Sequence, residues 1–175
     1  MREDQQNDAR ERYEQALHIH SESQDNLELA NTLVALGDLD MSEDRLQDAR
    51  GRYDQALPIY NDIQDDLGVA STLKSLADLD ARENRFQNAR ERYEQALPIY
   101  TDAQDDLGLA NALRALGDLD TREKRLQDAR ERYQQALPKY RDIQDSLGLA
   151  NTLKALGDLD RLEGRFQDAR ELYDQ

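Results

Sequence analysis

The sequence predicts an all-α fold, a solenoid of antiparallel helix pairs, and three observations support it. A unit of about 40 residues recurs along the chain, and 29 of 40 positions are identical between residues 81–120 and 121–160. Within each unit, apolar residues recur at steps of three and four. Turn and capping residues occupy the same places between those stretches in every unit.

The repeat extends over all 175 residues, which are therefore predicted to form a single array. The predicted units are 1–40, 41–80, 81–120, 121–160 and a partial unit, 161–175. Each unit holds two helix-length segments, which we name A helices and B helices. A helices are predicted at 26–42, 66–82, 106–122 and 146–162. B helices are predicted at 3–22, 47–63, 87–103, 127–143 and 167–175.

Each helix type is justified by an apolar stripe on one of its sides. In the segment near 86–103, which holds a B helix, the stripe consists of Phe86, Ala89, Tyr93, Ala96, Leu97, Tyr100 and Ala103. The stripe of the A helix at 66–82 consists of Leu67, Ala70, Leu73, Leu76, Ala77 and Leu79. Because both stripes follow the helical period, the two segments are expected to pack against each other.

Polar residues mark the expected helix ends. Asp65, Asp105 and Asp145 precede A helices, where a carboxylate accepts hydrogen bonds from free amide groups. One site after the A helices holds Asp44, Asn84, Lys124 and Gly164. Glycine, asparagine and aspartate tolerate the left-handed conformation that ends a helix, but lysine fits it poorly.

The three prolines fall at one site inside the B helices, namely Pro58, Pro98 and Pro138, where the first unit has His18. Proline removes one backbone hydrogen bond of a helix. The apolar pattern continues beyond this site, so a bend is expected and not a helix end.

Composition excludes several classes of function. The formal net charge of −15 argues against nucleic-acid binding, because phosphate affinity needs clustered basic residues. The absence of cysteine excludes disulfides and thiolate zinc sites. Neither a signal peptide nor a membrane-length apolar run is evident. A reducing, cytoplasmic location and no membrane partner are therefore the expectation.

Residues that carry chemistry are scarce. His18 and His20 do not recur in later units, and their spacing of two directs them to different sides of a helix. The Asp-Leu-Asp triplets lack the spacing of a calcium loop and are expected to face solvent or cap helices. Apart from the two histidines, the sequence offers no base that could activate a nucleophile. We therefore expect that the protein is not an enzyme and binds neither a metal nor a cofactor.

The chain resembles the tetratricopeptide repeat superfamily. The resemblance rests on the spacing of Leu153, Leu156, Gly157, Gly164, Phe166, Ala169 and Tyr173, and of Leu73, Leu76, Ala77, Asn84, Phe86, Ala89 and Tyr93. It implies a right-handed superhelix. The unit is longer than the common form of about 34 residues, and Asp40, Asp80, Asp120 and Asp160 stand where a large aromatic residue is usual.

Long units of this kind are similar to those of kinesin light chains, polarity adaptors, and fungal and bacterial nucleotide-binding receptors. The phrases Gln-Ala-Leu-Pro-Ile-Tyr and Leu-Gly-Leu-Ala-Asn are most similar to the receptor group. The near-identity of the units indicates either recent duplication or consensus design.

In this superfamily the A helices line the concave groove, which implies a binding site on A-helix positions that face away from the B helices. The first set is Asn31, Ser71, Asn111 and Asn151. One turn on are Val34, Lys74, Arg114 and Lys154. A further turn on are Asp38, Asp78, Asp118 and Asp158, followed by Met41, Ala81, Thr121 and Arg161.

Two interpretations of these positions stay open. Asparagine can pair with an extended peptide backbone, and the basic set can bind acidic side chains. Alternatively, each basic residue pairs with the aspartate four residues later. The resemblance also implies that the clamp for heat-shock chaperone tails is missing, since it needs asparagine where this chain has Asp38, Asp78, Asp118 and Asp158.

The function that follows is a non-enzymatic scaffold that binds a protein or peptide of unknown identity in the groove. The alternative is a structural module, natural or designed, that forms a homodimer or larger assembly through the apolar open ends of the array.

Overall fold

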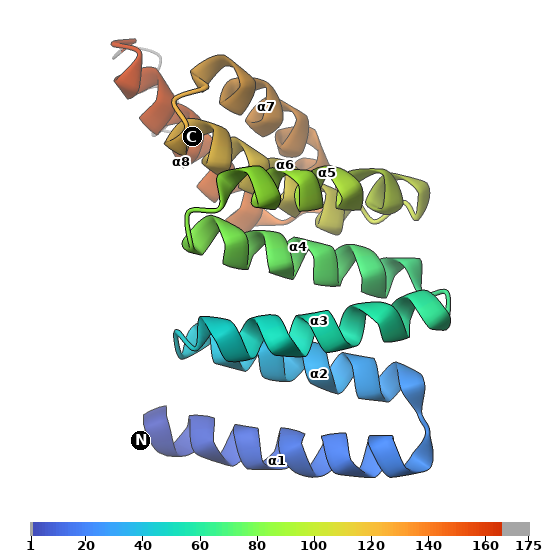
Figure 1. The fold of residues 1–175 in the computed structure, drawn as a ribbon. Coiled ribbons are helices and arrows are strands. Elements are labelled where there is room, and N and C mark those ends of the chain that lie inside the picture. The colour runs from blue at the N-terminus through green and yellow to red at the C-terminus, as the bar shows by residue number, and fades with distance from the viewer. Residues whose placement is uncertain (1, 166–175) are drawn as a thin grey trace. The chain divides into compact units, whose positions relative to one another are not determined.

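The computed structural model describes residues 2–165, and side chains from residue 8 onward. This part of the chain consists of eight α-helices and short turns (Figure 1). The helices are α1 (Arg2–Ser23), α2 (Asn26–Ser42), α3 (Leu46–Asp62), α4 (Asp66–Arg82), α5 (Phe86–Asp102), α6 (Asp106–Arg122), α7 (Leu126–Asp142) and α8 (Ser146–Leu162). The predicted helix at 167–175 lies outside the described residues.

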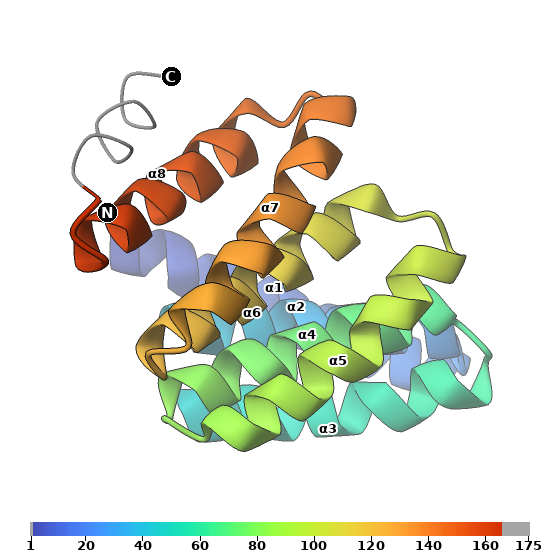
Figure 2. The same cartoon turned by 90° about the horizontal axis from the view of Figure 1, so that it is seen from above.

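Backbone contacts divide the chain into two compact units, Met1–Arg85 and Phe86–Gln175. In the first unit, α2 packs on α1 and on α3, and α3 packs on α4. In the second unit, α6 packs on α5 and on α7, and α7 packs on α8. Figure 2 shows that α7 and α8 run in opposite directions. The predicted all-α fold of sequential antiparallel helix pairs is confirmed.

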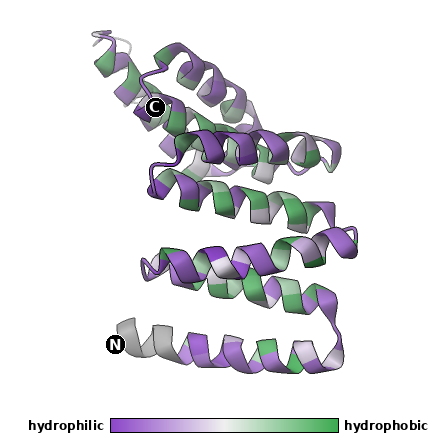
Figure 3. Cartoon of the chain, in the orientation of Figure 1, coloured by the Kyte–Doolittle hydropathy of each residue, from purple (hydrophilic) through white to green (hydrophobic). Residues whose placement is uncertain are grey.

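The even-numbered helices are the A helices and the odd-numbered helices are the B helices. Within each unit the A helices also contact each other, α2 with α4 and α6 with α8. Figure 3 shows apolar and polar residues alternating around the helices, as amphipathic stripes require.

Alanine and tyrosine make the core where A and B helices meet. In the first unit, Ala49 and Tyr53 of α3 pack with Leu76 and Leu79 of α4. The equivalent cluster of the second unit contains Tyr133 of α7. The alanines are fully buried and let the helix backbones come close enough for the large tyrosine rings to fill the remaining space.

Each A helix begins at an aspartate whose side chain caps it. The carboxylate of Asp65 accepts a hydrogen bond from the amide of Gly68 at 3.0 Å, and that of Asp105 accepts one from Gly108 at 2.9 Å. Asp145 accepts two amide hydrogen bonds. These contacts confirm the capping role predicted from the sequence.

The A helices end in a left-handed residue, as predicted, but Lys124 was misjudged. Its φ of 62° is close to the 61° of Asp44 and Asn84. The next amide, of Arg125, donates to the carbonyl of Asp120 at 2.8 Å, which closes the helix end. The geometry of this turn overrides the local preference of lysine. The B helices end in the same way, at Gln24, Gln64, Gln104 and Gln144.

The prolines lie inside continuous helices. Pro58 is within α3, Pro98 within α5 and Pro138 within α7, and each helix continues for four residues after its proline. The expectation that the helix does not end at proline is therefore confirmed.

Candidate functional site

The predicted binding residues lie on the A helices. Asn31 on α2, Ser71 on α4 and Asn151 on α8 are exposed, whereas Asn111 on α6 is half-buried. Because α2 contacts α4 and α6 contacts α8, each unit carries two neighbouring A helices with polar side chains at this position. We call the surface formed by the predicted binding residues of the two A helices in each unit an A face.

The two asparagines of α2 and α6 are engaged by tyrosines of the following B helix. The hydroxyl of Tyr60 donates to Oδ1 of Asn31 at 2.7 Å, and the hydroxyl of Tyr140 donates to Oδ1 of Asn111 at 2.8 Å. Both rings are buried. Asn31 and Asn111 therefore touch the B helix, contrary to the expectation that they face away from it, and their side chains are fixed by the core.

The basic residues one turn on form the alternative contacts foreseen from the sequence. Lys74 binds Asp78 at 2.7 Å, Arg114 binds Asp118 at 2.9 Å and Lys154 binds Asp158 at 2.8 Å. In the first repeat the position holds Val34, which packs against apolar clusters. Pairs of this spacing contribute about 0.2–0.5 kcal/mol, so a ligand with a competing charge can displace them at small cost.

Two aspartates of the A faces also accept hydrogen bonds from core tyrosines. Tyr53 donates to Asp38 at 2.7 Å, and Tyr133 donates to Asp118 at 2.8 Å. Burial and the neighbouring carboxylate raise the pKa of both tyrosine hydroxyls well above the usual range. Burial also raises the pKa of the Asp38 carboxyl. The hydroxyls therefore remain protonated donors at any physiological pH.

The second aspartate of each Asp-Leu-Asp triplet has a role that the sequence interpretation missed. It neither faces solvent nor caps a helix: the side chain of Asp40 is 1% exposed. Its Oδ1 binds Arg10 of α1 at 2.7 Å and Arg45 of the following turn at 2.9 Å. Glu43 binds the same two guanidinium groups at 3.0 and 2.7 Å.

This four-residue ionic cluster recurs in every repeat that the structure describes. Arg50 binds Asp80 at 2.6 Å, and Arg90 binds Asp120 at 2.6 Å. The last cluster joins Arg130, Asp160, Glu163 and Arg165. Each cluster connects a B helix to the next A helix and to the turn after it. The sequence signal for it is an arginine that precedes an aspartate by 30 residues in each repeat.

Burial is costly for these carboxylates. Burial raises the pKa of Asp40 and Asp120, although Arg10 and Arg90 act in the opposite direction. Buried ion pairs stabilise a fold weakly but are expensive to break. Removal of one partner from a cluster is therefore expected to destabilise the contact between the two helices.

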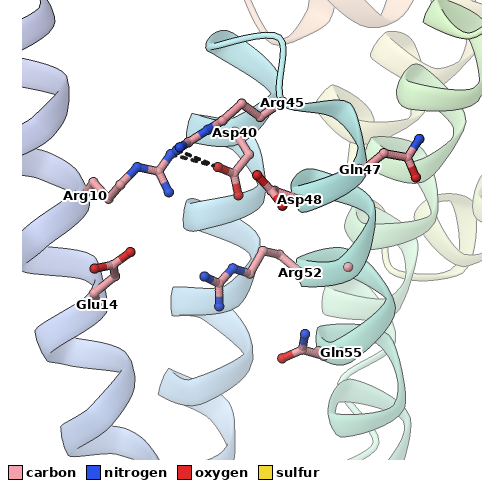
Figure 4. Close-up of a pocket in the computed structure, with 9 residues that line it drawn as sticks. Arg10, Glu14, Asp40, Arg45, Gln47, Asp48, Arg52 and Gln55 are labelled. Carbon is pink, nitrogen blue, oxygen red and sulfur yellow. Dashed lines mark hydrogen bonds and ion pairs between the residues drawn. The ribbon is translucent and has the colours of Figure 1, made fainter.

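A polar pocket of ≈ 400 Å³ lies beside the first cluster (Figure 4). It is lined by Arg10, Glu14, Asp40, Arg45, Gln47, Asp48, Gly51, Arg52 and Gln55. Three arginines face three carboxylates, so the lining has no net formal charge to select an ion. The pocket is open at Gly51, where later repeats have Glu91 and Glu131.

Metal chemistry has no site among the described residues, because no group of three or more His, Cys, Asp or Glu side chains converges there. His18 instead lies 3.4 Å from Glu22, and both side chains are largely exposed. In residues 2–165 no helix combines the length and apolarity that crossing a membrane requires.

Similarity to solved structures covers nearly the whole chain. BtubC (BKLC), a protein from P. vanneervenii, has a TM-score of 0.87 and 23% identity, over 99% of this chain and 72% of that one. A putative kinesin light chain from Podosopora anserina with nearly identical TPR-like repeats has a TM-score of 0.77 and 18% identity, over 99% and 86%.

The Rap conjugation gene regulator of plasmid pLS20, solved in complex with the Phr* peptide, has a TM-score of 0.72 and 18% identity. That match covers 87% of this chain, which spans less than half (44%) of the regulator. At these identities the likeness shows the shared fold. No curated protein matches the sequence.

The family comparison matches the tetratricopeptide repeat over residues 28–102, 68–142 and 108–175. These overlapping matches extend from the start of α2 into the second unit and beyond α8. The alternation of A and B helices, their small-residue contacts and these matches agree. The chain belongs to the tetratricopeptide repeat family.

Proposed function

We propose that this protein is a scaffold without catalytic activity of its own, and that it binds a peptide or protein segment on its A faces. The observation that carries the proposal is the pre-set position of the A-face amides. Tyr60 holds Asn31 and Tyr140 holds Asn111 by hydrogen bonds from buried rings. A side chain that is already ordered loses little conformational entropy when a ligand binds.

The ligand that suits these groups is an extended segment with acidic side chains. Each asparagine amide can donate to a backbone carbonyl of the segment while its oxygen accepts from the tyrosine. Arg114 and Lys154 can exchange their intrahelical aspartate partners for a carboxylate of the ligand. The pLS20 Rap regulator, which shares the fold, was solved with a peptide bound, and this supports a peptide ligand here.

Affinity capture with the full chain tests the proposal. The triple variant Asn111→Ala, Arg114→Ala and Asn151→Ala is expected to lose the captured partner and to keep its helix content by circular dichroism. The matched control replaces Glu94 and Gln95, two exposed residues of α5 outside the A faces, with alanine. Capture that survives the triple variant, or is lost in the control, shows that the A faces are not the binding surface.

A further inference from the structure

Helix α3 contains a glycine that neither its backbone conformation nor its packing requires. Gly51 lies inside the helix, and a Cβ at this position would meet no atom within 4 Å. Glycine destabilises a helix interior relative to alanine, because it loses more conformational freedom on folding. The equivalent residues Glu91 and Glu131 each accept a hydrogen bond from a glutamine one turn earlier, at 2.7 and 3.1 Å. Glycine in this repeat therefore points to a role other than stability.

The missing side chain leaves open the polar pocket of ≈ 400 Å³ beside the first ionic cluster (Figure 4). This volume is in the range of sites that hold small molecules. Gln47 has no glutamate to pair with at position 51 and donates to Glu83 instead, at 3.0 Å. Each of the other eight lining residues has an identical residue 80 positions later, as Arg10 has Arg90. Glycine in place of glutamate is thus the one difference between the two sets.

The charged groups that the ionic cluster leaves unused have both signs. Arg10 and Arg45 are neutralised within the cluster, partly by a glutamate that lies outside the pocket lining. Within the described part of the chain, the side chains of Glu14, Asp48 and Arg52 form no hydrogen bond or ion pair. Figure 4 shows Arg52 extending from α3 toward α1, which carries Glu14. The pocket therefore offers two carboxylates and one guanidinium group to a ligand.

A buried carboxylate also lines the pocket and lacks one hydrogen bond. The side chain of Asp40 is 1% exposed, and its Oδ1 binds both arginines of the cluster. Its Oδ2 has no hydrogen-bond partner among the described residues. Asp48 and Arg52 lie close enough to act on this carboxylate electrostatically. Because a buried acceptor is costly to leave without a donor, a cationic N–H group beside Asp40 and Asp48 is favoured.

We propose that this pocket binds a free basic α-amino acid such as arginine. Its α-ammonium group would donate to Asp48 and to Oδ2 of Asp40, and its α-carboxylate would accept from Arg52. Its basic side chain would bind Glu14 of α1. Such a molecule carries two positive charges and one negative charge, which complement the unused groups of the pocket. The site lies apart from the A faces, because no A-face residue lines it.

Calorimetric titration of the full chain with L-arginine tests the chemistry of the ligand. Binding to a single site with a Kd below about 1 mM is expected. Citrulline has nearly the same shape without the side-chain charge, and agmatine lacks the α-carboxylate. Each should bind about tenfold more weakly than arginine, because each loses one charge-assisted hydrogen bond. A Kd for arginine above about 1 mM, or equal binding of the three molecules, overturns the proposal.

Two matched variants test the location. Gly51→Gln places an uncharged side chain at the pocket and should abolish arginine binding. Glu131→Gly makes the lining set of the second unit identical to that of the first, and should add a second arginine site. Circular dichroism checks that both variants keep their helices. Undiminished binding by Gly51→Gln, or no added site in Glu131→Gly, overturns the proposal. The A-face triple variant should bind arginine like the unmodified chain, so this proposal and the proposed function can fail separately.

Discussion

Removal of one buried aspartate tests how far the ionic clusters hold neighbouring helices together. Asp120 is 1% exposed and binds Arg90 at 2.6 Å and Arg125 at 2.9 Å. In Asp120→Ala, two guanidinium groups share the single carboxylate of Glu123. Breaking a fully buried pair from one side costs about 3–5 kcal/mol. Arg125 is 40% exposed and water can solvate it, so we expect a loss of about 2–3 kcal/mol, below the range for full burial.

Urea unfolding followed by circular dichroism measures the effect, with Asp120→Asn as the variant that keeps the shape and removes the charge. The control is Lys154→Ala, which removes a pair whose lysine is 70% exposed and should change stability by no more than about 0.5 kcal/mol. If Asp120→Ala falls within about 1 kcal/mol of the unmodified protein, the clusters do not hold the helices together. Asn at this site should lie between the alanine variant and the unmodified protein.

Three further predictions concern packing, turns and ligand choice. In Gly148→Ala the new Cβ would lie 2.3 Å from the buried ring of Tyr140, so thermal unfolding should show a loss of about 1–3 kcal/mol in the free energy of unfolding. The control is Gly51→Ala, which has open space around it and should gain up to about 1 kcal/mol in the free energy of unfolding. Lys124→Gly should raise stability in urea by up to about 1 kcal/mol, because glycine adopts the φ of 62° without strain; a lower midpoint would contradict this. Peptides with the C-terminal sequence and free carboxylate of heat-shock chaperone tails should show no binding in calorimetry, because Asp118 and its equivalents repel that carboxylate. Binding with low micromolar affinity would refute this repulsion.

Much of the fold was predictable because its determinants are local. The spacing of Ala89, Tyr93 and Ala96 specifies a helix face within a dozen residues. Asp65 caps its own helix three residues later. Features of this range repeat in every unit, and repetition makes them easy to recognise.

The ionic clusters and the tyrosine contacts were not predicted, because their partners are distant in sequence. Arg10 and Asp40 are 30 residues apart, and Tyr60 and Asn31 are 29 apart. An aspartate in a helix is usually exposed, so its residue type alone argues for a solvent position. Lys124 failed for a different reason: its conformation is imposed by the turn and not by its own preference.

The ionic clusters also bear on how unfolding spreads within each unit. In α-solenoids, stability is a sum of terms for single repeats and for the contacts between neighbours. Arg50 lies on α3, while its partners are Asp80 of α4 and Glu83 in the turn after α4. When α3 unfolds, the buried carboxylate of Asp80 and the partly exposed carboxylate of Glu83 keep one arginine fewer, so the stability of α4 falls at once. Loss of one helix therefore promotes loss of the next, which makes frayed intermediates short-lived and unfolding cooperative.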